Sequence, residues 1–299
     1  MSDDRRSAIT IIALLGSVFS PYYARARARG AADPLMHCSM NVALYGPRPR
    51  DDRWALTERP RAAVSRSPRA LAIGPSRMEW SGGELRVAFD ETTAPIPSRL
   101  AGTVRLRPAA PEPAAPGPRG ARAGVTLDRS GRHRWAPLAP IARAEVELTH
   151  PSLRFTGSAY LDTNAGDEPL DRAFESWTWS RAVGADGIAL TYDVRRRDGT
   201  RMLLARAFDA AGGARELPPL VPRPLGDTRW GMERSIAADL GSSPRLLRTY
   251  EDTPFYARSL AAATFGGKPA TVVHEALSLD RFASPWVQFL LPFRMRREA

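Results

Sequence analysis

The sequence predicts a mostly β protein with two similar halves, each folded as a barrel or a sandwich. The 299 residues include 23 glycines and 27 prolines, spread along the chain, and such frequent breakers argue against long helices. Between them recur short segments in which apolar and polar residues alternate, as expected of strands with one buried face. With 43% hydrophobic residues, a chain of this length can bury the core of one large domain or of two ordinary ones.

The first expected element is an apolar run at residues 8–19, rich in β-branched side chains, which we interpret as a buried strand. A secretory signal peptide is the alternative, because Arg5 and Arg6 precede the run. However, Asp3 and Asp4 cancel that positive charge, and the run is too short to span a bilayer.

Further along the chain, period-2 alternation predicts strands at residues 85–89, 102–107, 144–149, 153–161, 188–194 and 201–208. Asp198-Gly199 separates the last two segments and predicts a tight hairpin turn between them.

Proline-rich stretches at residues 108–118 and 217–224 predict loops rather than linkers, because strand patterns resume on both sides. Asn, Gly, Asp and Pro cluster at residues 164–169, which predicts the domain boundary and divides the chain into residues 1–168 and 169–299. Helical signals are few, and a short helical turn is expected at residues 280–283.

The charge balance is basic, with 43 Lys and Arg against 32 Asp and Glu, a net charge of +11. This permits an anionic partner such as nucleic acid or a lipid surface, but it does not select between them. No recognisable nucleic-acid module accompanies the basic residues, so no nucleic-acid partner is expected. The single cysteine, Cys38, excludes an internal disulfide and favours a reducing compartment such as the cytoplasm.

Several chemistries leave no motif in the sequence. Gly266-Gly267-Lys268 is followed by proline and does not form a phosphate-binding loop, and His274-Glu275 lacks the second histidine of a zinc protease motif. GxGxxG after a strand and the GxSxG nucleophile motif are both absent. We therefore expect neither a cofactor nor a metal.

Two short segments, residues 131–137 and 157–169, could carry chemistry. If both are strands, alternation places His133 and Trp135 on one face of the first, and Tyr160 and Asp162 on one face of the second. A carboxyl group among aromatic rings is disfavoured as an anion, so the pKa of Asp162 should rise and make it a proton donor near neutral pH. The structural alternative remains open, since such an aspartate often only caps a turn and aromatic side chains in strands usually pack in a core.

The sequence also resembles a known family, the acyclic carotenoid 1,2-hydratases, or hydroxyneurosporene synthases, of photosynthetic bacteria. The matching stretches keep their order over nearly the whole chain, at residues 16–23, 37–46, 54–59, 73–76, 131–135, 162–170, 251–259, 274–282, 284–288 and 291–295.

The resemblance implies two tandem lipocalin-like β domains, with the active site in the N-terminal one. It implies cofactor-independent addition of water to the terminal 1,2 double bond of acyclic carotenes such as neurosporene and lycopene, in the spheroidene and spirilloxanthin pathways. The family's functional His, Trp, Tyr and Asp fall on His133, Trp135, Tyr160 and Asp162. Asp162 would protonate the alkene, Trp135 and Tyr160 would stabilise the tertiary carbocation, and His133 would accept a proton from water.

The chain departs from the family pattern near its start and in two later places. An aromatic-rich strand that relatives carry upstream of Ser2-Asp3-Asp4 is missing, which predicts an exposed sheet edge and puts activity in doubt. Residues 24–29 carry Arg and Ala where relatives tend to keep a Trp, and Pro60 stands where a Gly is common.

Two rival functions remain: a lipocalin-like carrier that binds hydrophobic molecules without turnover, and an isomerase or lyase acting on another lipid.

The acyclic carotene substrate that the resemblance implies is uncharged, so the arginines do not attract it. We expect instead that two basic–aromatic patches rest on an anionic inner or photosynthetic membrane, with the protein cytoplasmic and peripheral. They comprise Arg25, Arg27 and Arg29 near Tyr22-Tyr23, and Arg294, Arg296 and Arg297 after Phe293.

Overall fold

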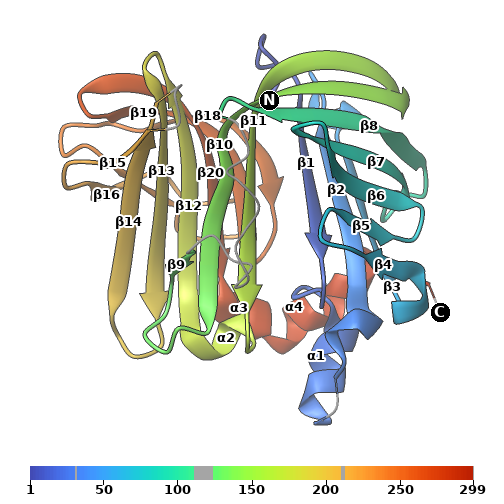
Figure 1. The fold of residues 1–299 in the computed structure, drawn as a ribbon. Helices are drawn as coiled ribbons and strands as arrows, with labels where there is room; N and C mark the ends of the chain where they lie inside the picture. Colours follow the sequence, from blue (N-terminus) through green and yellow to red (C-terminus); the bar gives the residue numbers. More distant parts are fainter. Residues whose placement is uncertain (31, 111–123, 210–212, 299) are drawn as a thin grey trace. The chain divides into compact units, whose positions relative to one another are not determined.

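A computed structural model describes residues 1–30, 32–110, 124–209 and 213–298, and it confirms the mostly β prediction (Figure 1). The described strands form four sheets. The predicted loop at residues 108–118 falls largely outside the described residues, so the structure does not test it.

Two sheets contain most strands of the first half of the chain. A four-stranded sheet has the order β1-β2-β3-β21, with β1 (Ala8–Leu14), β2 (Cys38–Tyr45), β3 (Arg53–Arg59) and β21 (Arg296–Arg297). An eight-stranded sheet has the order β11-β10-β8-β7-β6-β5-β4, with β9 paired to β10. Its strands are β4 (Val64–Arg66), β5 (Ala70–Ile73), β6 (Ser76–Ser81), β7 (Glu84–Thr92), β8 (Arg99–Pro108), β9 (Val125–Thr126), β10 (His133–His150) and β11 (Ser152–Gly166).

The other two sheets lie in the second half. A seven-stranded sheet has the order β15-β14-β13-β12-β20-β19-β18, with β12 (Phe174–Gly184), β13 (Gly187–Arg196), β14 (Arg201–Phe208), β15 (Ala214–Glu216), β18 (Arg245–Asp252), β19 (Tyr256–Phe265) and β20 (Lys268–Ser278). A two-stranded sheet joins β16 (Val221–Pro224) to β17 (Ser235–Ala238).

The described helices are short, as the frequent glycines and prolines predicted. They are α1 (Pro21–Ala28), α2 (Leu170–Ala173), α3 (Leu279–Ala283) and α4 (Pro285–Leu290), with 3-10 turns at Pro34–His37, Pro49–Asp51, Arg61–Ala63 and Leu291–Phe293. The turn expected at residues 280–283 is confirmed as α3. The sequence prediction overlooked α1, although Ser20 caps its first turn through the Tyr23 N–H and Pro21 occupies its first position.

The chain forms two compact units that are discontinuous in sequence. Unit 1 comprises Met1–Glu112, Ala142–Tyr160 and Gln288–Ala299, and unit 2 comprises Pro113–Ile141 and Leu161–Val287. The predicted single cut between residues 168 and 169 does not coincide with this division, because β10 and β11 each contribute one part to each unit. Of the two expected alternatives, a barrel or a sandwich, the closed barrel does not apply, since the strand orders describe open sheets.

The individual strand predictions agree well with the structure. All six alternating segments lie in strands, and Arg195 pairs with Arg201 across the Asp198-Gly199 turn, where Gly199 has φ +79°. The run at residues 8–19 forms β1, but this strand is half-buried and shorter than expected, ending before Gly16 at φ +76°. The predicted loop at residues 217–224 is partly wrong, because β16 fits prolines in a two-stranded sheet that has no central strand.

A strand of the seven-stranded sheet in unit 2 carries a buried, uncharged imidazole, that of His274. His274 on β20 is fully buried, and its Nδ1 lies 2.9 Å from the Ser180 hydroxyl of β12. Burial, and to a lesser extent the positive charge of Arg234, lowers the pKa of His274 to about 3. The folded protein therefore holds this histidine neutral across the physiological range.

This histidine predicts a specific loss of stability in acid. In the unfolded chain it takes up a proton below its ordinary pKa of 6.5, whereas in the folded chain it does so only near pH 3. Between pH 6.5 and 5, the free energy of unfolding should therefore fall by about 2 kcal/mol more in the wild type than in His274→Asn. Urea unfolding of both proteins at the two pH values measures this difference, and equal losses would contradict the prediction.

Candidate active site

The structure brings Trp135 and Asp162 into direct contact within unit 2. The indole Nε1–H of Trp135 donates a hydrogen bond of 2.7 Å to Oδ2 of Asp162. Trp135, near the start of β10, is 1% exposed, and Asp162, near the end of β11, is half-buried. Antiparallel neighbours that share a face approach closely, so a buried donor on one strand can hold the carboxylate of the next.

Aromatic side chains of the seven-stranded sheet pack next to Trp135. The ring of Tyr192 on β13 meets that of Trp135 edge-on, with centroids 5.5 Å apart and planes at 69°. The ring of Trp177 on β12 also contacts Tyr192, with centroids 5.6 Å apart. The sequence prediction missed Tyr192, because its segment, residues 188–194, was identified only as one arm of a hairpin.

Two physical effects act on the Asp162 carboxyl group in opposite directions. Its partial burial disfavours the ionised form, whereas a hydrogen bond from Trp135 N–H favours it. The Asp162 charge also reaches Tyr192, whose phenol pKa is raised by burial, then by Asp162 and Glu275. The raised pKa expected for Asp162 therefore stays a prediction.

His133 opens β10 and is 1% exposed. Its ring packs on Phe174, with centroids 4.8 Å apart, and its Nε2 lies 3.8 Å from Oε1 of Glu168. Among the described residues, neither ring nitrogen of His133 has a hydrogen-bond partner. Burial lowers the pKa of His133, although Asp128, Glu168 and other carboxylates oppose the shift. The imidazole is thus neutral at pH 7 and able to accept a proton.

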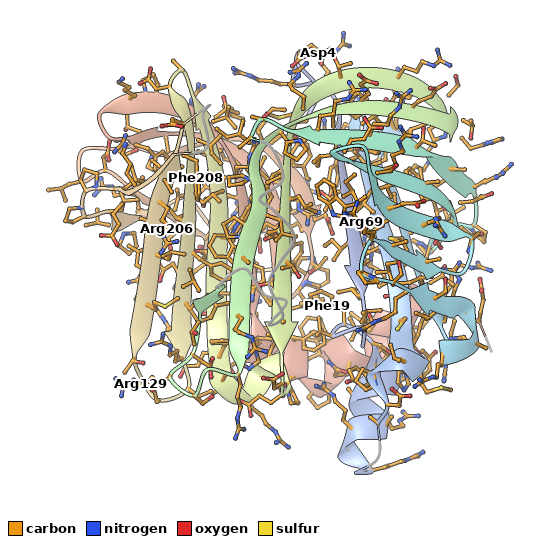
Figure 2. The ribbon with its side chains drawn as sticks, viewed as in Figure 1. Asp4, Phe19, Arg69, Arg129, Arg206 and Phe208 are labelled. Carbon is orange, nitrogen blue, oxygen red and sulfur yellow. The ribbon has the colours of Figure 1, made fainter. Side chains whose placement is uncertain are left out.

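A hydrogen bond and an ion pair fix the connection that precedes His133. Its own N–H donates to Oδ1 of Asp128 at 2.8 Å, and Arg129 in the same connection pairs with Asp198 of the β13–β14 turn; Figure 2 labels Arg129. Gly166, at the end of β11, lies so close that an added Cβ would be 2.9 Å from Nδ1 of His133. Only a glycine leaves the imidazole in this position.

Tyr160 lies two residues before Asp162 on β11, so the two side chains share one strand face, as predicted. Tyr160 is half-buried and is the last residue of β11 that belongs to unit 1. Asp162, His133 and Trp135 belong to unit 2. The active site was expected in the N-terminal domain, residues 1–168, and stays a prediction; of the four candidate residues, three belong to the unit that contains the seven-stranded sheet. Over the described ranges, no cluster of His, Cys, Asp or Glu is suited to hold a metal ion.

Comparisons with known proteins agree on one family. The family model described as carotenoid hydratase CrtC matches residues 11–299. The chain is 51% identical to an acyclic carotenoid 1,2-hydratase of Thiocapsa roseopersicina, covering 99% of this chain and 71% of the relative. The corresponding enzyme of Rubrivivax gelatinosus is 46% identical, with 100% and 72% covered, and that of Cereibacter sphaeroides 40%, with 96% and 98% covered.

A solved structure supports the fold. The chain is similar to a protein assigned as AttH from Nitrosomonas europaea, with a TM-score of 0.59, 15% identity and 81% of each chain covered. At this level of identity, the likeness concerns the arrangement of strands.

Proposed function

Because this chain belongs to the carotenoid hydratase CrtC family, we propose that its Trp135–Asp162 pair protonates an acyclic carotene in the first step of hydration. The chain is a hydro-lyase that adds water to the 1,2 double bond of acyclic carotenoids. The observation that supports the proposed step is the 2.7 Å hydrogen bond from a buried indole, itself packed on the Tyr192 ring, to the Asp162 carboxyl group.

The first chemical step follows from the substrate. A trisubstituted alkene offers water no electrophile, so a proton must be added first. In the proposed step, protonated Asp162 transfers its proton to the less substituted carbon, C2, and the π electrons form the new C–H bond. The positive charge remains on C1 as a tertiary carbocation, and Asp162 becomes a carboxylate.

In the second step, water captures the carbocation. The oxygen of water bonds to C1, and neutral His133 accepts the released proton directly or through a second water. Proton return from His133 to Asp162 through solvent restores both groups, so the net change is the addition of one water molecule. The π face of Trp135 stabilises the cation between the two steps, by roughly 2 kcal/mol where the ring is desolvated. No resident cofactor takes part in this scheme.

The hydrogen bond from Trp135 is selective for the transition state. Its acceptor, the Asp162 carboxyl group, is neutral before proton transfer and becomes a carboxylate during it. Hydrogen bonds to ionised acceptors are about twice as strong as those between neutral groups. The bond therefore lowers the barrier more than it stabilises the bound substrate, which is the requirement for catalysis.

We expect Trp135→Phe to lower kcat by roughly 10- to 100-fold while retaining part of the activity, because the aromatic face remains and the N–H donor is lost. Initial rates of lycopene hydration by purified protein measure the effect. An unchanged kcat would show that the hydrogen bond has no catalytic role, whereas complete loss with normal carotene binding would assign the indole a larger positioning role.

Product analysis tests the function as a whole. A lycopene- or neurosporene-producing host that expresses this chain should accumulate the 1-hydroxy derivative, identified by mass and retention against a standard. The non-catalytic carrier considered above would bind carotene and yield no hydroxylated product. An enzyme acting on other lipids would leave both carotenes unchanged and would be revealed by testing several lipids in the same assay.

We further propose that the protein is cytoplasmic and contacts an anionic membrane surface through unit 1. Phe289 and Phe293, whose rings lie 5.8 Å apart, are 71% and 60% exposed. The guanidinium group of Arg297 stacks over the Tyr22 ring of α1 at 4.5 Å, which joins the two basic–aromatic segments. Exposed aromatic rings beside arginines suit the headgroup region, where carotenes are also within reach.

Over the described parts of the chain, every helix is too short or too polar to cross a bilayer.

Co-sedimentation with vesicles tests this contact. Binding to vesicles rich in phosphatidylglycerol should exceed binding to neutral phosphatidylcholine vesicles and should weaken as salt rises. Replacing Phe289 and Phe293 by Ser should reduce binding without changing the unfolding midpoint, since both side chains are exposed. Binding that ignores salt, or no binding at all, would remove the proposal.

A further inference from the structure

Tyr192 connects the candidate pair to the interior of unit 2. Its side chain is nearly completely buried, and its ring contacts both Trp135 and Trp177. The contact with Trp135 is edge-to-face, an arrangement that aromatic pairs prefer and that restricts rotation of both rings. Tyr192 has no role in the proposed proton transfers, although it lies next to the hydrogen-bonded indole.

Tyr192 belongs to a row of side chains that crosses neighbouring strands of the seven-stranded sheet. On neighbouring antiparallel strands, Tyr192 stands directly opposite Trp179, and Trp179 stands opposite Glu275. Glu275 in turn stands opposite Arg258, whose guanidinium binds it at 2.9 Å. Directly opposed residues project from the same face, so these four side chains line one face of the seven-stranded sheet. The other end of the row is held by the Arg258–Glu275 ion pair.

The direction of the Trp135 indole matters for the proposed chemistry. A planar ring can rotate about its bond to Cβ, and only one orientation aims Nε1–H at Asp162. A side chain that fixes this orientation before substrate binds avoids reorganisation during the reaction. Among the ring contacts of Trp135 described above, the one with Tyr192 is placed to do so.

We propose that Tyr192 is a positioning residue, whose ring holds the Trp135 indole so that its N–H points at the Asp162 carboxyl group. The proposal rests on the proposed acid role of Asp162. The phenol hydroxyl is not required, because the ring makes the contact. Burial and the nearby carboxylates keep that hydroxyl protonated, so the side chain stays neutral throughout turnover.

Three variants separate positioning from packing. Tyr192→Leu removes the ring, and Tyr192→Phe keeps it while removing the hydroxyl. The matched control is Phe265→Leu, which also removes a buried ring from unit 2 but lies in the hydrophobic cluster with Ile236 and Val272. Urea unfolding should show that Tyr192→Leu and Phe265→Leu are both destabilised, and all assays are run where each protein is folded.

Two readouts decide the outcome. In ligand-free protein labelled with ¹⁵N-tryptophan, the Trp135 indole N–H signal, assigned by its loss in Trp135→Phe, should move upfield in Tyr192→Leu and stay in place in Tyr192→Phe. The kcat for lycopene should fall about tenfold in Tyr192→Leu, stay within twofold of the wild type in Tyr192→Phe, and be unchanged in Phe265→Leu.

Several results would overturn the proposal. An unmoved indole signal and an unchanged kcat in Tyr192→Leu would show that Tyr192 does not position Trp135. A loss in Tyr192→Phe as large as in Tyr192→Leu would assign the effect to the hydroxyl instead. If Asp162→Asn keeps the wild-type rate, the proposed function fails, a result obtained without reference to Tyr192.

Discussion

Replacing Asp162 by Asn should abolish carotene hydration while leaving the fold intact. An amide has no acidic proton to transfer to the alkene, and general acids contribute roughly 10²- to 10⁴-fold to rates. The amide oxygen can still accept the hydrogen bond from Trp135, so the local contact that Asp162 makes with the buried indole is preserved. We therefore expect Asp162→Asn to cause a large loss of kcat with little change in structure.

The measurement is the rate of 1-hydroxy carotenoid formation by purified protein, with carotene binding followed separately. Asp167→Asn is the matched control, because Asp167 lies in the same segment, is exposed and pairs with Arg134 on the surface. We expect this control to keep the wild-type rate. An Asp162→Asn enzyme that forms the alcohol at the wild-type rate would exclude Asp162 as the acid.

The second large effect is expected at His133. Replacement by Phe should lower kcat by roughly 10²- to 10⁴-fold, because the group that accepts a proton from water is removed. The ring of Phe can pack on Phe174 as the imidazole does, and among the described residues no hydrogen bond to the ring nitrogens is lost. Loss of activity with retained stability would therefore report on chemistry rather than on packing.

The position of the imidazole can be tested without removing it. Gly166→Ala adds a Cβ that would lie 2.9 Å from His133 Nδ1, so the ring must shift. We expect a smaller loss of kcat than in His133→Phe, with an acid limb of the pH–rate profile that differs from that of the wild type. An unchanged rate in both variants would remove His133 from the mechanism.

The pH profile of the wild-type enzyme follows from the state of His133. Because burial lowers the pKa of His133, the neutral form persists below pH 6.5. As pH falls further, protonation removes the proton acceptor, so the rate should decline on the acid side at a pH below 6.5. This acid limb should be absent from the residual activity of His133→Phe.

Local patterns in the sequence predicted most of the strands. Alternation marked the segments that became β7, β8, β10, β11, β13 and β14, and Asp198-Gly199 marked the hairpin between the last two. These predictions succeed because the side-chain period of a strand and the conformational demand of a tight turn are properties of a few neighbouring residues. The same alternation placed Tyr160 and Asp162 on one face of β11.

Longer-range features were beyond the sequence patterns. The boundary at residues 164–169 was inferred from composition, but β10 and β11 run through both units, and nothing in their local pattern reveals which part packs where. The strand β16 was overlooked because prolines are usually absent from central strands. In the two-stranded sheet β16 is an edge strand, paired with β17 alone, and proline is tolerated there.

The sequence by itself determined the mostly β fold, the family, and His133, Trp135, Tyr160 and Asp162 as candidate residues. Only the tertiary structure decided that Trp135 donates to Asp162, that Gly166 lies against His133, and that Tyr192 braces the indole. The physical reason is that alternation assigns a side chain to a face of its own strand, whereas contacts depend on the register and packing of strands distant in sequence. Tyr192 lies 57 positions after Trp135, and only the packed sheet brings their rings to 5.5 Å.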